Sequence, residues 1–192
     1  GTAANPGAVV LWFDEDAASA EWDGEDAADS LWSSRTNWIG DTVVCDGADL
    51  LFAAGRAQQN NTNDVLTFAQ SISLGDEYTL NGNRLDLFGN VSSSGTNTLA
   101  LGLGLQERLM FDVTSGSLTL SGSLSGTGGV WKAGAGTLDI AGGGYRGPTV
   151  VSNGMVRLVG PTVGSALPVS GAAIWLRADS LALADGAGVA AW

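Results

Sequence analysis

A spaced recurrence of short apolar triplets is the feature that most constrains the fold of this chain. Residues 116–159 contain Leu118-Thr119-Leu120, Leu138-Asp139-Ile140 and Val156-Arg157-Leu158, in which apolar and polar residues alternate. The first residues of the triplets are 20 and then 18 positions apart (118 to 138, 138 to 156), and Gly, Ser, Thr and Asn fill most of the intervals. Period-two alternation is typical of half-buried strands, and recurrence at about 20 residues is typical of a solenoid whose repeats pack on their neighbours. The sequence therefore predicts an all-β fold, a β-solenoid.

The rest of the chain carries the same strand pattern with a different segment at each end. We expect further strands at 42–45, 49–52, 65–68, 72–74, 78–80, 85–87, 99–101 and 109–111. The polar stretch 56–64 predicts a surface loop, and Asn81-Gly82 predicts a tight turn. No segment has a helical period, and the 29 Gly residues disfavour helices.

Three regions are expected along the chain. Residues 1–40 form an acidic, Trp-rich N-terminal strand and cap, and residues 41–160 form the repeat body. Residues 161–192 are a C-terminal strand segment, interpreted either as the start of a following jelly-roll-like domain or as an assembly strand. Pro161 and Pro168 mark this boundary.

Trp22, Trp32 and Trp38 lie within 17 residues and allow two interpretations. The favoured one is packing, in which the indoles cover the first coil of the solenoid. The alternative is a carbohydrate-binding module, in which the indole faces stack on sugar rings.

The charge excludes some partners and suggests one ion. The chain has 20 acidic and 8 basic residues, a net charge of −12, and eleven of the acids lie in residues 1–50. Such a chain repels nucleic-acid phosphates and anionic membrane surfaces, and no stretch is long enough to cross a bilayer. Carboxylates in turn-like settings make calcium the one candidate ion, although a solvated acidic surface is the preferred interpretation. The candidate ligands are Asp14, Asp16, Asp23, Asp46 and Asp49.

Catalytic chemistry is not expected, and neither is a cofactor. Histidine is absent, which removes the commonest general base. Asp86, Asp112 and Asp139 occupy the outward position of alternating triplets and are interpreted as solvated. Lys132 is expected on the surface, and Cys45 is expected to be a small buried hydrophobe rather than half of an intermolecular bridge.

Residues 126–158 resemble a known repeat. The run GTGGVWKAGAGTLDIAGGGYRGPTVVSNGMVRL is similar to the autotransporter-associated β-strand repeat, also called the passenger-associated transport repeat. Gly144-Tyr145 departs from that pattern, in which Asn-Thr-Tyr is common. The N-terminal Trp-rich stretch resembles the lead-in to such repeats, and 172–183 resembles the first strand of concanavalin-like jelly rolls. The positions that fall on the repeat pattern are Gly126, Gly128, Gly129, Lys132, Gly134, Gly136, Thr137, Leu138, Gly142, Gly147, Thr149, Val151, Gly154 and Leu158.

The resemblance implies an exported, right-handed parallel β-helix that serves as a stalk, passenger or adhesive surface at the bacterial cell surface. It supplies no catalytic residues. Both ends carry an apolar strand, and strand addition between copies would produce an end-to-end homopolymer. Other cell-surface components are the alternative partners. The candidate assembly residues are Val9, Val10, Leu11, Trp12, Phe13, Ile174, Trp175 and Leu176.

Overall fold

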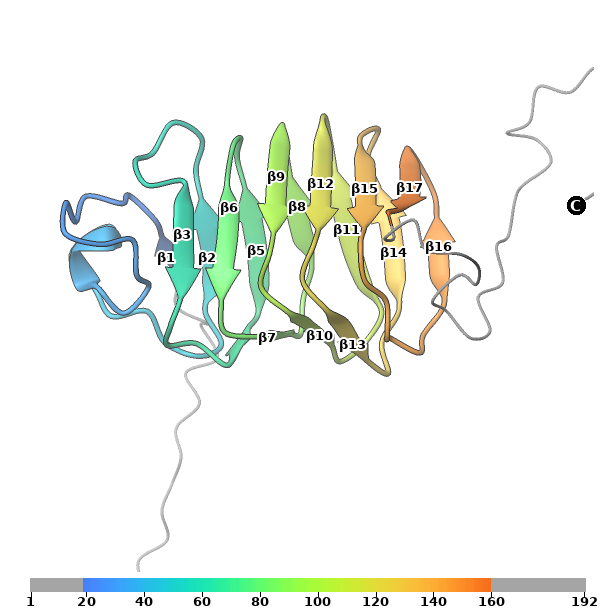
Figure 1. Ribbon diagram of the computed structural model, residues 1–192, viewed down its shortest axis with the longest axis horizontal. Coiled ribbons are helices and arrows are strands. Elements are labelled where there is room, and N and C mark those ends of the chain that lie inside the picture. The colour runs from blue at the N-terminus through green and yellow to red at the C-terminus, as the bar shows by residue number, and fades with distance from the viewer. Residues whose placement is uncertain (1–18, 160–192) are drawn as a thin grey trace, which may run out of the picture.

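The computed structural model describes residues 19–159, and this part of the chain is a β-solenoid built from three parallel sheets (Figure 1). The seven-stranded sheet contains β1 (Ser19–Glu21), β2 (Asp49–Phe52), β5 (Ser71–Leu74), β8 (Val91–Ser93), β11 (Leu109–Val113), β14 (Val130–Ala133) and β16 (Thr149–Val151). The six-stranded sheet contains β3 (Asn60–Asn63), β6 (Thr79–Gly82), β9 (Thr96–Leu99), β12 (Ser117–Leu120), β15 (Thr137–Ile140) and β17 (Met155–Leu158). The four-stranded sheet contains β4 (Phe68–Ala69), β7 (Leu85–Leu87), β10 (Leu103–Leu105) and β13 (Leu124–Gly126).

From β2 to β13 the chain visits the three sheets in turn, so each of these four coils contributes one strand to each sheet, whereas β14 to β17 add strands to two sheets only. Strands β5, β6 and β7 form one such coil, and β8, β9 and β10 form the next. The named strands of residues 19–159 all pair in parallel, as a chain that always winds the same way requires. The coils stack along the long axis from β1 to β17, with the six-stranded sheet toward the viewer in Figure 1. The expected all-β solenoid is therefore confirmed.

The strand pairing in the structure follows the repeat that the sequence predicted. Leu118 aligns with Leu138, and Leu138 aligns with Val156. Leu120, Ile140 and Leu158 form the neighbouring column in the same way. Because side chains alternate across a strand, every second residue enters the core and stacks on its equivalent in the next coil.

The core is a narrow column of aliphatic side chains. Leu80, Leu99 and Leu120 are buried in successive coils of the six-stranded sheet, as are Leu85 and Leu103 in the four-stranded sheet. Full burial of one such side chain contributes about 1.5–3 kcal/mol. Each coil gains this contribution only where a neighbouring coil covers its apolar side chains. The two ends of the solenoid therefore need another kind of cover.

The polar stretch 56–64 is not the surface loop that its composition predicted. It contains β3, in which Asn61 and Asn63 are fully buried. Asn63 Oδ1 accepts hydrogen bonds from the backbone N–H groups of Val65 (3.2 Å) and Leu66 (2.8 Å). These bonds form the corner between β3 and β4, where backbone donors have no ladder partner and a buried donor must find another acceptor. Here asparagine belongs to the core because it replaces missing backbone partners.

One predicted strand is absent, and one predicted turn lies at a corner of the coil. Residues 42–45 form no strand, and within them Val44 is buried while Cys45 is exposed. Asn81-Gly82, the predicted tight turn, ends β6 at a corner of the coil. Gly82 has φ of 98°, which glycine adopts without steric cost. The predicted tight turn is thus a corner of the solenoid.

Candidate functional site

The three tryptophans of the N-terminal region close one end of the core. Trp22, Trp32 and Trp38 are fully buried, and all three rings lie within 6.1 Å, centroid to centroid, of Phe52. Trp22 and Trp38 meet edge to face with centroids 5.3 Å apart. Such arrangements are favoured by the ring quadrupoles.

Each indole N–H of this cluster is also satisfied inside the protein. Trp22 donates to the carbonyl of Ala57 (3.1 Å), Trp32 donates to Asn61 Oδ1 (2.8 Å), and Trp38 donates to the carbonyl of Trp32 (2.8 Å). A sugar platform needs an exposed indole face, and these three rings have none. The packing interpretation is supported, and the glycan-binding interpretation does not hold for these side chains.

The acidic calcium candidates are not assembled into one site. Asp46 accepts bonds from the Thr67 hydroxyl (2.7 Å) and from the backbone N–H groups of Thr67 (2.7 Å) and Phe68 (3.1 Å). Burial opposes ionisation of Asp46, but these bonds outweigh it and lower its pKa. Asp49 accepts a bond from the Ser71 hydroxyl. Both carboxylates thus tie one coil to the next.

The remaining calcium candidates add nothing to such a site. Asp23 receives a weak bond from the backbone N–H of Glu25 (3.4 Å), and Asp14 and Asp16 lie outside the described residues. Within residues 19–159, no group of three or more acidic or cysteine side chains is placed to hold a metal ion.

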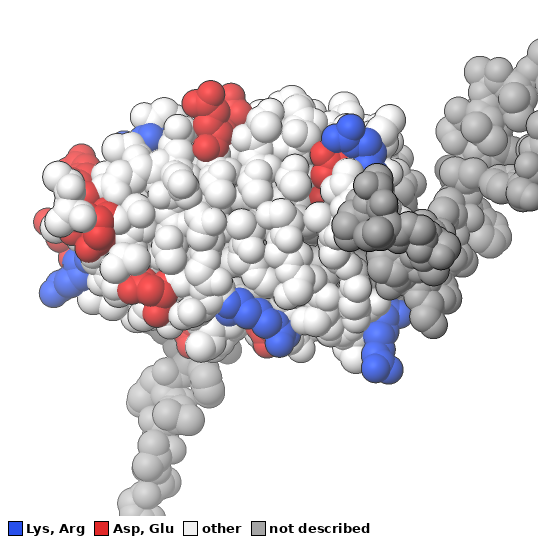
Figure 2. All heavy atoms as spheres, viewed as in Figure 1, with Lys and Arg blue, Asp and Glu red and all other residues white. Residues whose placement is uncertain are grey.

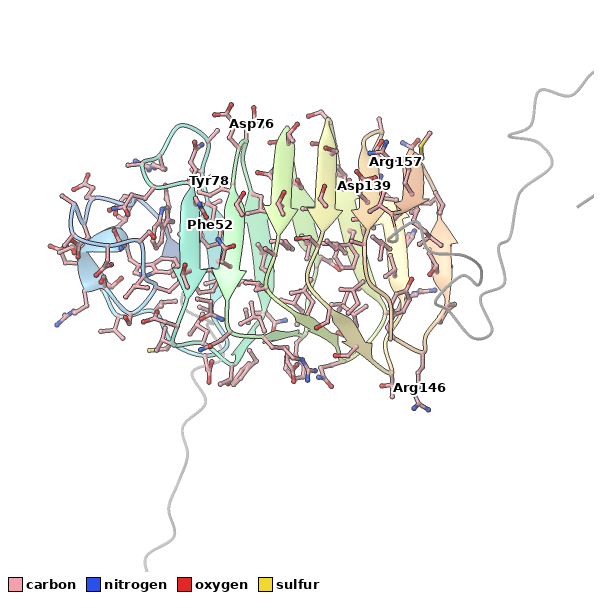
Figure 3. The ribbon with its side chains drawn as sticks, viewed as in Figure 1. Phe52, Asp76, Tyr78, Asp139, Arg146 and Arg157 are labelled. Carbon is pink, nitrogen blue, oxygen red and sulfur yellow. The ribbon has the colours of Figure 1, made fainter. Side chains whose placement is uncertain are left out.

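The three strand aspartates are separated, and one of them is buried. Asp86 pairs with Arg84 (Oδ1 to Nη2, 2.7 Å) at a half-exposed position, and Asp112 is also half-exposed. Asp139 is 5% exposed, because Arg157 from the next coil lies over it and donates from Nε (2.6 Å) and Nη2 (2.5 Å). The expectation that Asp139 is solvated was wrong. The labelled pair lies on neighbouring strands of the six-stranded sheet in Figure 3.

Lys132 lies in the core, against our expectation of a surface position. Its exposure is 0%, and its ammonium group donates to the carbonyls of Ala133, Gly134 (2.7 Å) and Asn153 (3.3 Å). Burial lowers the pKa of Lys132, and the negative charge of Asp112 partly opposes this. The sequence did carry a signal for this position. Residues two apart on a strand face the same side, and Lys132 follows the inward residue Val130 by two positions on the same strand. Lys132 joins the corner after β14 to the corner before β17.

The structure places Cys45 at the surface, where it is a free thiol. The expected small buried hydrophobe at this position is therefore wrong, and its neighbour Val44 takes that role. The candidate assembly residues 9–13 and 174–176 lie outside the described residues.

The end of the solenoid formed by β16 and β17 is the candidate functional surface. Val151 and Leu158 continue inward columns, through the pairs Lys132–Val151 and Ile140–Leu158, but they are 49% and 42% exposed. Their partners Lys132 and Ile140 are 0% and 3% exposed. Strands β16 and β17 are the last members of their sheets within residues 19–159. We call this surface, formed by Val150, Val151, Met155, Val156, Leu158 and Val159, the open end.

Charge is sparse on the outer face of the six-stranded sheet. Figure 2 shows this face mostly without Lys, Arg, Asp or Glu, and the charged groups lie chiefly toward its edges and the Trp-rich end. The outward positions of the middle strands carry Thr79, Thr98 and Thr119 in one aligned row. The face therefore presents hydroxyl groups and has no cluster of like charges.

Comparisons of the chain with family models, with curated proteins and with solved structures found no match. Within the described part of the chain, no helix has the length and apolar character needed to cross a membrane.

Proposed function

We propose that this chain is a non-catalytic structural module of an exported bacterial protein, serving as a surface stalk, an adhesin segment or an extracellular fibre subunit. The observation that carries the proposal is the continuous column of stacked side chains from the Trp-rich end to the open end. A solenoid of this kind spans distance at a fixed width, because each coil contacts only its neighbours. Its length is then set by the number of coils.

The polar groups of the described residues support the same role. Asp46, Asp49 and Asp139 each bond to a residue of an adjacent coil, and Lys132 bonds to three backbone carbonyls. These groups hold coils together and are not free for acid–base chemistry. A surface pocket of about 150 Å³ is lined by Leu74, Ser92, Ser93, Ser94 and Thr114, so no acid or base side chain stands beside its hydroxyl groups.

Export is supported by the resemblance of residues 126–158 to the passenger repeat of secreted bacterial surface proteins. The fibre form of the proposal adds end-to-end contacts between copies, since an unpaired strand edge is a template for another strand. In the stalk form, the same module is a spacer inside a longer rod.

Negative-stain electron microscopy of the purified chain at several concentrations, with and without calcium, tests the proposal. Dispersed rods of one length support the stalk form, and uniform fibres that lengthen with concentration support the fibre form. In the fibre form, deletion of residues 1–13 abolishes assembly, and unchanged fibres after that deletion contradict assembly through this strand. Turnover of a polysaccharide by the purified chain would contradict the non-catalytic role.

A further inference from the structure

The open end differs from every other level of the solenoid. In the described coils before it, the inward columns of the six-stranded sheet are covered on both sides, and Leu118, Leu120 and Leu138 are at most 1% exposed. At the Trp-rich end the indoles cover Phe52. At the open end Leu158 and Val151 have, among the described residues, a strand neighbour on one side only. On β17 the inward residues are Val156 and Leu158, and a strand that covers them needs two apolar side chains two positions apart.

The backbone of β17 also has a free side. Met155 and Val159 donate their N–H groups to the carbonyls of Gly136 and Ile140 in the coil before. Because N–H directions alternate along a strand, those of Val156 and Leu158 point away from that coil, toward the open end. Unpaired edge groups of this kind accept another strand.

The chain itself contains a segment with the matching pattern. Successive strands of the six-stranded sheet are offset by 18 to 21 residues, as Leu138 with Val156 (156 − 138 = 18) and Leu118 with Asn97 (118 − 97 = 21) show. The same offsets place the partner of Val156 at 174–177 and the partner of Leu158 at 176–179. The only pair in these windows with large apolar residues two positions apart is Ile174 and Leu176. It corresponds to an offset of 18, the value of the preceding step.

The connecting length is also suitable. Residues 141–154 join β15 to β17 and carry β16 on the way, which makes 14 residues (154 − 141 + 1). Residues 159–173 would join β17 to Ile174, which makes 15 residues (173 − 159 + 1). A covalently attached strand has a high effective concentration at its site, so it is favoured over a second copy of the chain.

We propose that residues 173–177 dock in parallel on β17 of their own chain, with Ile174 on Val156 and Leu176 on Leu158, and so cover the β17 side of the open end. In this register Trp175 and Arg177 point outward, and Trp175 lies beside Arg157. The inference does not depend on the proposed structural role.

The test uses the proposed register, in which the side chains of Ile174 and Leu176 point into the core and that of Trp175 points outward. The full chain is compared with the double variant Ile174→Asp/Leu176→Asp and with the matched control Trp175→Asp. Amide hydrogen exchange of Val156 and Leu158 is followed by NMR, and the mass in solution is measured by light scattering. The expected result is slow exchange in the full chain and in the control, and exchange at least tenfold faster in the double variant, with all three monomeric.

Three outcomes would overturn the proposal. The first is fast exchange of Val156 and Leu158 in the unaltered chain. The second is an equal effect of Trp175→Asp, which would show that the strand is absent or in another register. The third is slow exchange that weakens on dilution together with a dimer mass, which would assign the open end to a second copy. None of these outcomes bears on whether the chain is a catalyst, so the structural role is tested separately.

Discussion

Lys132 shows how a polar residue serves a solenoid core. It stacks between Phe111 and Val151 in an inward column, where an apolar residue would be ordinary. Its ammonium group instead reaches the carbonyls of Gly134 and Asn153, which lie at corners of two successive coils. Carbonyls at such corners have no ladder partner, and leaving one buried without a donor is costly.

Replacing Lys132 with Met is therefore expected to destabilise the protein although the shape is kept. The corner carbonyls lose their donor, which lowers the free energy of unfolding by about 1–3 kcal/mol. Urea denaturation followed by far-ultraviolet circular dichroism measures the change. Arg146→Met is the matched control, because Arg146 is exposed and its loss should change stability by less than about 0.5 kcal/mol. Equal stability of the two variants would contradict a structural role for the ammonium group.

Tyr78 provides a pH-dependent prediction at the same scale. The side chain is 1% exposed and donates to the carbonyl of Ala53 (2.7 Å). Burial raises the pKa of Tyr78 from 10.0 to about 12. Because the folded state resists ionisation, its stabilising contribution is complete below pH 10.0 and is lost as the pH rises toward about 12.

Tyr78→Phe should accordingly lose less stability than the unaltered protein between these two pH values. Urea titrations at neutral pH and within this alkaline interval give the two differences, and absorbance of the phenolate follows ionisation directly. At neutral pH the variant should be less stable by about 1 kcal/mol, the net value of one hydrogen bond. Identical alkaline losses in both proteins would show that Tyr78 is not protected from ionisation.

At the scale of strands, alternation and recurrence were sufficient to predict the solenoid and the alignment of Leu118, Leu138 and Val156. They failed where side chains replace backbone partners. Asn61 and Asn63 are polar and yet buried, because they bond to corner groups that no single strand pattern reveals. The pair between Asp139 and Arg157 was also missed, although the 18-residue step from Leu138 to Val156 places the two side by side.

Stacking also controls which glycines are replaceable. A Cβ on Gly128 would overlap the carbonyl oxygen of Glu107 in the coil before, whereas a Cβ on Gly143 meets nothing within 4 Å. Gly128→Ala must therefore push two coils apart and should cost about 1–3 kcal/mol, as overpacking does. Gly143→Ala should be neutral or slightly stabilising. Melting temperatures of the two variants make the comparison, and equal values would mean that the coils adjust without cost.

The whole molecule is a stack in which each coil contacts its neighbours and little else. Stability is then nearly a sum of terms for coils and for the interfaces between them. The Trp-rich end is closed by buried rings, and the other end depends on whatever covers β16 and β17. A local weakness should therefore remain local, in contrast to its effect in a domain with one compact core.

Asp139→Ala tests whether a local weakness remains local at the end formed by β16 and β17. The substitution removes the two hydrogen bonds from Arg157 and leaves part of a buried position unfilled, so β17 should separate from β15 more often. Hydrogen exchange measured by mass spectrometry should then accelerate in peptides from β15 to β17 and remain unchanged from β2 to β6, because partial opening there does not disturb distant coils. Asp86→Ala is the control, since its pair with Arg84 is half-exposed and contributes little. Equal acceleration along the whole chain would mean that the solenoid unfolds as one cooperative unit instead of from its end.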